Sequence, residues 1–183
     1  MSRGAEPVRV GLIGFGTIGA GVVKVLRAHR AEIARRVGRP IDIVTIADLD
    51  TRTDRGVAVP PARLVPDARA VLEDPDVSIV IELIGGYEPA RRFVLAAIRA
   101  GKDVVTANKA LLAVHGEEIV AEAEARGVRL GFEASVGGGI PILRTLREGL
   151  AGDRTAAWPC PPPGSSPTRV QSSRTRTSRS SSS

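Results

Sequence analysis

The sequence predicts an α/β fold built on a doubly wound parallel sheet. Two observations indicate it. Short apolar runs rich in β-branched residues alternate with amphipathic stretches up to residue 153, as expected of repeated strand–helix–strand units. The first run also leads directly into a glycine pattern, Gly14-x-Gly16-x-x-Gly19, followed at once by a helical pattern. Such a sheet binds ligands beyond the carboxyl ends of its strands, so we expect the functional residues in the loops that follow strands.

The first half of the predicted elements is set by clear boundaries. Residues 8–13 are a β-branched run, and residues 17–36 continue as one long helix that Gly38-Arg39-Pro40 ends. Residues 41–47 alternate isoleucine and valine with polar residues and form the second strand. Residues 50–66 contain three prolines and a glycine and are expected to form an irregular loop.

After residue 66, predicted strands and helices continue to alternate. Residues 67–73 form a short helix that stops at a proline, and residues 77–84 are nearly all apolar, as in a central parallel strand buried on both faces. Residues 89–100 form a helix that Gly101 ends. The remaining predicted elements are strands at 103–106 and 128–132 and helices at 117–126 and 142–150.

The glycine pattern predicts a dinucleotide site. Gly14 permits a tight turn after the strand, Gly16 lets a pyrophosphate approach the backbone, and Gly19 lets the helix pack close to the strand. The first-turn N–H groups of the following helix face the anion. The alternative is a glycine-rich turn that binds nothing.

Asp48 follows the second strand and indicates which nicotinamide cofactor is used. An acid here hydrogen-bonds the adenosine ribose and favours NAD over NADP. Asp48 could instead be a solvated turn residue, and Arg52 and Arg55 could pair with a 2′-phosphate. The choice between NAD and NADP therefore stays open, with a lean towards NAD.

Two later loops carry further candidates. Gly85-Gly86 permits close approach of the cofactor's sugar or nicotinamide, although a plain turn would look the same. In Thr106-Ala107-Asn108-Lys109, the lysine could bind an anionic substrate, contact the cofactor or donate a proton, or it could be a solvated charge.

The segment from Glu133 to Ile140 contains three consecutive glycines and one carboxylate. Oxygen ligands of this kind suit a hard cation, although a flexible connection into the last helix is the simpler reading. His29 and His115 have no partner at metal spacing and are expected on a helix surface and in a turn.

The composition argues against nucleic-acid-binding, disulfide-rich and membrane proteins. The net charge is +6, but residues 154–183 hold five arginines and no acid, so the rest of the chain carries +1. Nucleic-acid binding by the body is therefore not expected. The single cysteine excludes a disulfide framework, and no apolar run reaches the length of a membrane span or signal peptide. We expect a soluble cytoplasmic protein without a membrane partner.

Four segments together resemble homoserine dehydrogenase of the monofunctional type, in order and spacing, over residues 8–153. They are Gly14-Phe15-Gly16-Thr17-Ile18-Gly19, Glu82-Leu83-Ile84-Gly85-Gly86, Thr106-Ala107-Asn108-Lys109 and Glu133-Ala134-Ser135-Val136-Gly137-Gly138-Gly139-Ile140-Pro141.

The resemblance implies a Rossmann-like NAD(P)-binding domain in an oxidoreductase that interconverts L-homoserine and L-aspartate 4-semialdehyde in threonine and methionine biosynthesis. It implies that the backbone around Phe15, Thr17 and Ile18 holds the cofactor and that Lys109 lies near the nicotinamide and acts in catalysis. It further implies homo-oligomers of the full-length form, and a sodium site made by Glu133 and the carbonyls of Val136, Gly138 and Ile140.

After residue 153 the resemblance ends. Residues 154–183 are rich in proline, serine and arginine, with few apolar residues, so we expect a disordered tail. Such a composition is typical of GC-rich coding DNA read in the wrong frame, which predicts a frameshift ahead of the family's substrate domain. The chain as written is then expected to lack turnover, because the family's second, general acid or base lysine is absent. The alternatives are a non-catalytic NAD(P)-binding module and an oxidoreductase with a cysteine nucleophile, for which the body has no cysteine.

Overall fold

The computed structural model describes residues 6–138 and 140–145. Six strands form one sheet in the order β3-β2-β1-β4-β5-β6, and every pairing is parallel. The strands are β1 (Val8–Ile13), β2 (Ile41–Ala47), β3 (Leu64–Val65), β4 (Ile79–Glu82), β5 (Asp103–Thr106) and β6 (Leu130–Gly131). The predicted doubly wound sheet is confirmed. The predicted disordered tail and the domain boundary after residue 153 lie outside the described residues.

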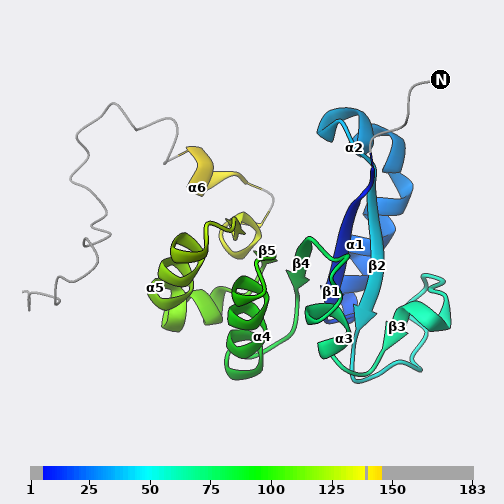
Figure 1. Cartoon of the computed structure of the whole chain (residues 1–183). Helices are drawn as coiled ribbons and strands as arrows, with labels where there is room; N and C mark the ends of the chain where they lie inside the picture. Colours follow the sequence, from blue (N-terminus) through cyan, green and yellow to red (C-terminus); the bar gives the residue numbers. More distant parts are fainter. Residues whose placement is uncertain (1–5, 139, 146–183) are drawn as a thin grey trace, which may run out of the picture.

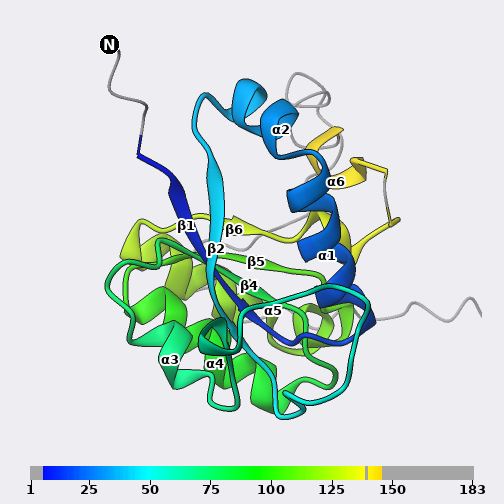
Figure 2. The same cartoon turned by 90° about the vertical axis from the view of Figure 1, so that its right-hand side faces the viewer.

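Helices cover both faces of the sheet. They are α1 (Thr17–Ala28), α2 (Arg30–Val37), α3 (Arg69–Leu72), α4 (Glu88–Arg99), α5 (Lys109–Arg126) and α6 (Ile142–Arg144), with 3₁₀ turns η1 (Pro61–Arg63) and η2 (Glu133–Ser135). Figure 1 shows α4 and α5 side by side, and Figure 2 shows α1 on the opposite side of β1 and β2 from α3 and α4.

The core is divided between these two faces. One cluster joins the central strands to the faces of α3, α4 and α5, with Val80, Val94 and Leu111 fully buried. The other joins Leu12 of β1 and Ile46 of β2 to Val23 of α1. Neighbouring positions of β1 and of β2 thus point to opposite faces, as the alternation of a strand requires, and both faces of these strands are buried.

The long helix predicted at 17–36 is wrong in one respect, because it is divided at His29. This residue has φ −109° and ψ 21°, which is outside the helical range, and it separates α1 from α2. Hydrogen bonding continues across the break, since the His29 N–H donates to the Val25 carbonyl and the His29 carbonyl accepts the Ile33 N–H. Gly38 then ends α2 with φ +81°, as the sequence predicted.

Four further elements differ from the prediction. The loop at 50–66 contains β3, whose two residues pair with Ile46 and Ala47 of β2 and are too short a run to be read from sequence. Strands β4 and β6 are shorter than the apolar runs that predicted them. Helix α5 begins at Lys109, eight positions before the predicted start at 117. Of the helix predicted at 142–150, the last five residues lie outside the described part of the chain.

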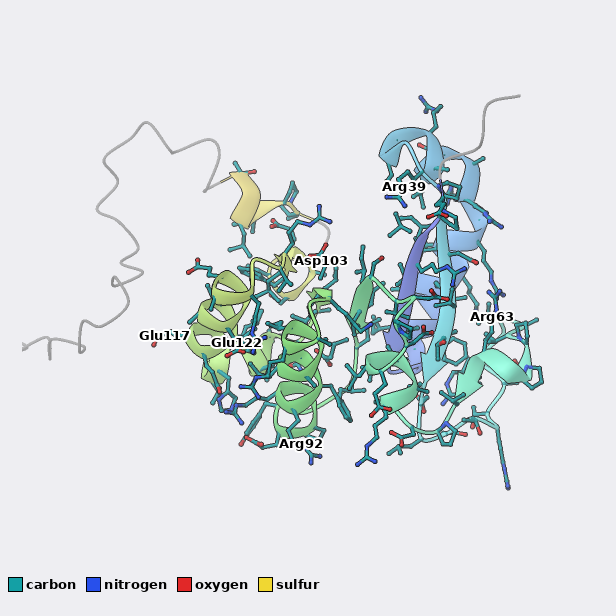
Figure 3. The ribbon with its side chains drawn as sticks, in the orientation of Figure 1. Arg39, Arg63, Arg92, Asp103, Glu117 and Glu122 are labelled. Carbon is teal, nitrogen blue, oxygen red and sulfur yellow. The ribbon has the colours of Figure 1, made fainter. Side chains whose placement is uncertain are left out.

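Parallel pairing brings the carboxyl ends of all the strands to one edge of the sheet. The strand order reverses between β1 and β4, which is the position where ligands bind in this architecture. Arg39 and Asp103 mark the opposite edge, where β2 and β5 begin (Figure 3).

Candidate cofactor site

The turn after β1 contains three glycines, and the structure requires glycine at only some of these positions. Gly14 has φ +100°, and a Cβ there would lie 2.8 Å from the carbonyl oxygen of Leu83. A Cβ on Gly19 would lie 2.1 Å from the carbonyl oxygen of Gly14. A Cβ on Gly16 would meet no atom within 4 Å among the described residues. Packing therefore requires Gly14 and Gly19, whereas Gly16 leaves open space where a ligand can approach the backbone.

The start of α1 adjoins that space. Within the described residues no side chain caps this helix, and its first turn holds no acidic residue. Thr17 and Ile18 are exposed, Ile18 by 62%. The first N–H groups of a helix have no acceptor within it and carry a partial positive charge. This end of α1 can thus hold an anion such as a pyrophosphate.

Asp48 joins the end of β2 to the glycine turn. Its Oδ2 accepts the backbone N–H of Phe15 at 2.5 Å, and its Oδ1 accepts the backbone N–H of Asp50 at 2.8 Å. The side chain is only 17% exposed. The Asp48 side chain is therefore held in place and is not a solvated turn residue, and its contact with a ribose stays a prediction.

Arg55 lies over the same turn. Its side chain is 12% exposed, and its guanidinium lies 3.1 Å from Asp50 and 3.5 Å from Asp48. Its Cζ lies 5.5 Å from the centre of the Phe15 ring, which is within the range of a cation–π contact. Hydrogen bonds from the Thr53 side chain and from the backbone of Thr53 and Arg52 lower the pKa of Asp50 to about 2. Arg55 thus has an ionised carboxylate partner at neutral pH.

A buried carboxylate lies at the end of β4. Glu82 is fully buried, and its two oxygens accept the backbone N–H of Ile84 at 2.8 Å and the hydroxyl of Thr106 at 2.6 Å. Burial raises the pKa of Glu82 above its ordinary value, although these hydrogen bonds oppose the shift. The next loop begins at Gly85, where a Cβ would meet nothing within 4 Å among the described residues.

Asn108 connects this loop to the start of α5. Its side-chain nitrogen donates to the carbonyls of Gly86 at 2.6 Å and of Ile84 at 3.3 Å. Its side-chain oxygen accepts the N–H of Leu111 at 3.1 Å and so caps the helix. Lys109 is the first residue of α5 and is exposed beside this connection. The contacts of Gly85, Thr106 and Lys109 with a cofactor stay predictions.

Sequence reasoning did not single out Glu82 and Asn108 as site residues. A signal for each was present, namely a lone acid in an apolar central strand and an asparagine directly before a helical pattern. Their contacts join two strand ends that are adjacent only in the sheet.

The predicted cation segment follows β6. Glu133 Oε1 accepts the N–H of Leu143 at 2.9 Å, and the carbonyl of Ile140 accepts the N–H of Ile142 at 2.8 Å. Gly137 and Gly138 both have positive φ, at +72° and +64°. Val136 and Ile140 are exposed. Two of the four predicted oxygen sources therefore already accept backbone N–H groups.

The two histidines lie at helices and not directly after strands. His29 is at the junction of α1 and α2 and is exposed. His115 lies inside α5, so its predicted place in a turn is wrong, and it is flanked by Glu88 at 3.6 Å and Glu118 at 3.9 Å. Among the described residues, no three histidine, cysteine, aspartate or glutamate side chains gather in a way that could hold a metal. In the same part of the chain, no helix has both the length and the apolar character to cross a membrane.

Comparisons with known proteins agree on one family. Residues 14–133 match the family model described as the NAD-binding domain of homoserine dehydrogenase. Over 149 residues, the chain is 48% identical to homoserine dehydrogenase of Bacillus subtilis, covering 81% of this chain and 34% of that protein. It is 49% identical over 148 residues to the enzyme of Corynebacterium glutamicum, covering 80% and 33%. The crystal structure of a homoserine dehydrogenase from Thiobacillus denitrificans superposes with a TM-score of 0.74 at 48% identity, covering 81% and 34%. The chain thus spans about a third of the length of these relatives.

Proposed function

Because the chain belongs to the homoserine dehydrogenase family, we propose that it provides the NAD(P)-binding part of an enzyme that interconverts L-homoserine and L-aspartate 4-semialdehyde. The observation that carries the proposal is the open backbone at Gly16, the one glycine of the motif that neither packing nor a positive φ requires. The residues present fit the cofactor, since an uncapped helix start, a half-buried acid and an open glycine lie beside one another at one sheet edge.

Each part of the cofactor has a proposed position. The pyrophosphate lies against the Gly14–Gly19 turn, where the N–H groups of Thr17 and Ile18 face it. The Phe15 N–H is already bonded to Asp48, so Phe15 acts by shaping the turn. The nicotinamide half lies beside Gly85, Thr106 and Lys109, at the carboxyl ends of β4 and β5. When bound, the cofactor supplies the hydride acceptor or donor for the reaction.

We propose that NAD is preferred over NADP. Asp48 lies at the end of β2, where an acid accepts hydrogen bonds from the adenosine ribose. A 2′-phosphate there would be repelled by Asp48 and would have to compete for Arg55 with two carboxylates that already contact it. The backbone N–H of Arg52 donates to Asp50 at 3.1 Å.

Lys109 is the proposed catalytic contact within this chain. A primary ammonium at the start of α5, beside the loop that follows β4, is placed to hydrogen-bond the nicotinamide half or the substrate oxygen. Lys109 is proposed as a cofactor and substrate contact and not as the general acid or base, because the resemblance assigns that role to a second lysine of the family.

A monovalent cation, sodium, is proposed at Glu133 and the carbonyls of Val136, Gly138 and Ile140. A single carboxylate with neutral carbonyls gives a donor set of low charge, which suits a hard monovalent ion. The cation would share or displace the N–H groups of Leu143 and Ile142 that these oxygens accept. Thermal unfolding in sodium chloride and in choline chloride tests this, with a higher Tm expected in sodium chloride. An equal Tm in both salts would exclude the site.

The proposed pathway is threonine and methionine biosynthesis in the cytoplasm, with a homo-oligomeric full-length form. The first test is a titration of the 183-residue chain with NADH and NADPH, followed by fluorescence. Saturable binding, tighter for NADH, is expected. If neither dinucleotide binds, the proposed function is wrong. An assay for homoserine-dependent NAD reduction by the same chain then separates turnover from cofactor binding alone, which is the property of a non-catalytic module.

A further inference from the structure

Glu82 is a buried carboxylate to which the proposed function assigns no role. It ends the central strand β4 and is fully buried. A carboxylate removed from water costs several kcal/mol unless hydrogen bonds compensate it. Packing alone does not explain a carboxylate at this position, because an apolar residue would stabilise a buried strand end better than Glu82.

A series of hydrogen bonds connects Glu82 through Thr106 to Asn108. The Thr106 hydroxyl donates to Glu82, and the Thr106 oxygen accepts the backbone N–H of Asn108 at 3.0 Å. Both side-chain donors of Asn108 bond carbonyls of the neighbouring loop. Because its side-chain oxygen also caps α5, the orientation of the Asn108 amide is fully determined. We refer to Glu82, Thr106 and Asn108 as the Glu82 network.

The Glu82 network holds two separate loops together. At one end it fixes Ile84, through the N–H bonded to Glu82 and the carbonyl bonded to Asn108. At the other end it fixes the residue that immediately precedes Lys109. Thr106 is also fully buried, so its hydroxyl serves the network and is not available to a ligand.

We propose that Glu82 is a positioning residue that, through Thr106 and Asn108, holds the Gly85–Gly86 loop and Lys109 in register to receive the nicotinamide half of the cofactor. The inference rests on the proposed function, because it concerns which half of the dinucleotide each part of the sheet edge binds. It reassigns Thr106 from direct cofactor contact to the same positioning role. The adenine half lies at β1 and β2, outside the network, and does not depend on it.

Calorimetric titration of the whole chain with NADH and with ADP tests the proposal, because ADP lacks the nicotinamide half. Two variants cut the network at different points. Glu82→Gln presents an amide to the Thr106 hydroxyl, and Asn108→Asp keeps the helix cap but removes both donors to the loop. Thr45→Val removes a threonine hydroxyl from β2, outside the Glu82 network, and serves as the control.

Each cut in the Glu82 network is expected to weaken NADH binding about tenfold or more, because Glu82→Gln disturbs the hydrogen bonds of a buried carboxylate and Asn108→Asp removes both hydrogen bonds to the loop. ADP affinity is expected to stay within about twofold, as is NADH affinity in the Thr45→Val control. The proposal is overturned if the two network variants leave NADH binding unchanged, or if they weaken NADH and ADP by the same factor, as general loss of structure would. If the unaltered chain binds neither ligand, the proposed function itself fails.

Discussion

The Asp48 carboxylate accepts the backbone N–H of Phe15 at 2.5 Å, across 33 positions of sequence. The bond links the end of β2 to the turn that follows β1, two strands that run side by side and in parallel. One acid thereby fixes the glycine turn and lies at the position that we propose for the ribose of a dinucleotide. The proposed cofactor selection is therefore coupled to the geometry of the turn.

Replacing Asp48 by alanine is expected to weaken NADH binding about tenfold, because the ribose loses its acceptor and the Phe15 N–H loses its partner. NADPH should lose less, since a repulsive charge near its 2′-phosphate is removed as well. Fluorescence titration with both dinucleotides measures the two constants. Asp42→Ala is the matched control, because Asp42 lies near the other end of β2 and pairs with Arg63 at 3.7 Å. An unchanged ratio of NADH to NADPH affinity in Asp48→Ala would contradict the proposed role in selection.

The three glycines of the turn should separate binding from stability. Gly16→Ala is expected to abolish most NADH binding with little change in the free energy of unfolding, because its Cβ meets only open space. Gly19→Ala is expected to lower the free energy of unfolding by about 3 kcal/mol, since its Cβ would overlap the Gly14 carbonyl. Urea denaturation and NADH titration measure both quantities.

Gly21→Ala is the control for the glycine variants. It lies in the same helix with no atom within 4 Å of an added Cβ among the described residues, so alanine should raise helix stability by about 0.5–1 kcal/mol. If Gly16→Ala retained full NADH binding, the open space beside it would not be the cofactor site.

The sequence predicted which candidate residues lie directly after strands. Gly16, Asp48, Gly85 and Lys109 could be placed there because each follows an apolar run, and parallel strands end at one edge. The Glu82 network could not be found in this way, since its bonds depend on β4 and β5 being neighbours in the sheet.

Helix boundaries were predicted less well where one residue decides them. The break at His29 and the early start of α5 depend on local backbone angles and on the Asn108 cap. Neither feature changes the spacing of the apolar residues, so hydrophobic periodicity does not report them. Right-handed crossover connections limit the possible strand orders of alternating elements but do not select one, so the order of the six strands comes from the structure.

The pairing of β5 with β6 should depend on pH through Asp103. Its carboxylate accepts the Arg129 backbone N–H at 2.8 Å and two guanidinium N–H groups at 2.9 and 2.6 Å. Burial raises the pKa of Asp103, but the bonds from Arg129 outweigh burial and leave it below the ordinary value of 3.8. A lowered folded-state pKa stabilises the protein above the unfolded-state pKa, and this contribution disappears as the pH falls through the folded-state value.

Asp103→Asn should therefore lower the free energy of unfolding by about 1 kcal/mol at neutral pH, a modest value because Arg129 is largely exposed. The difference from the unaltered chain should shrink below about pH 4. Urea denaturation at neutral and acidic pH measures it. Glu117→Gln removes an exposed charge on α5 (Figure 3) and should show no such trend. A difference that stays constant with pH would mean that the pairing with Arg129 adds no stability.

Glu82 should show the opposite dependence, because burial raises its pKa. Below the unfolded-state pKa the carboxyl is protonated in both states. As the pH rises from there to the folded-state pKa, the unfolded chain releases a proton that the folded chain retains, and the free energy of unfolding falls by about 1.4 kcal/mol per pH unit. Glu82→Gln removes this titration, so the stability of the unaltered chain relative to Glu82→Gln should decrease as the pH rises above about 4.5. Urea denaturation of both proteins between mildly acidic and neutral pH measures the difference. A difference that increased with pH would show that the hydrogen bonds from Thr106 and Ile84 overcome burial and hold Glu82 ionised throughout.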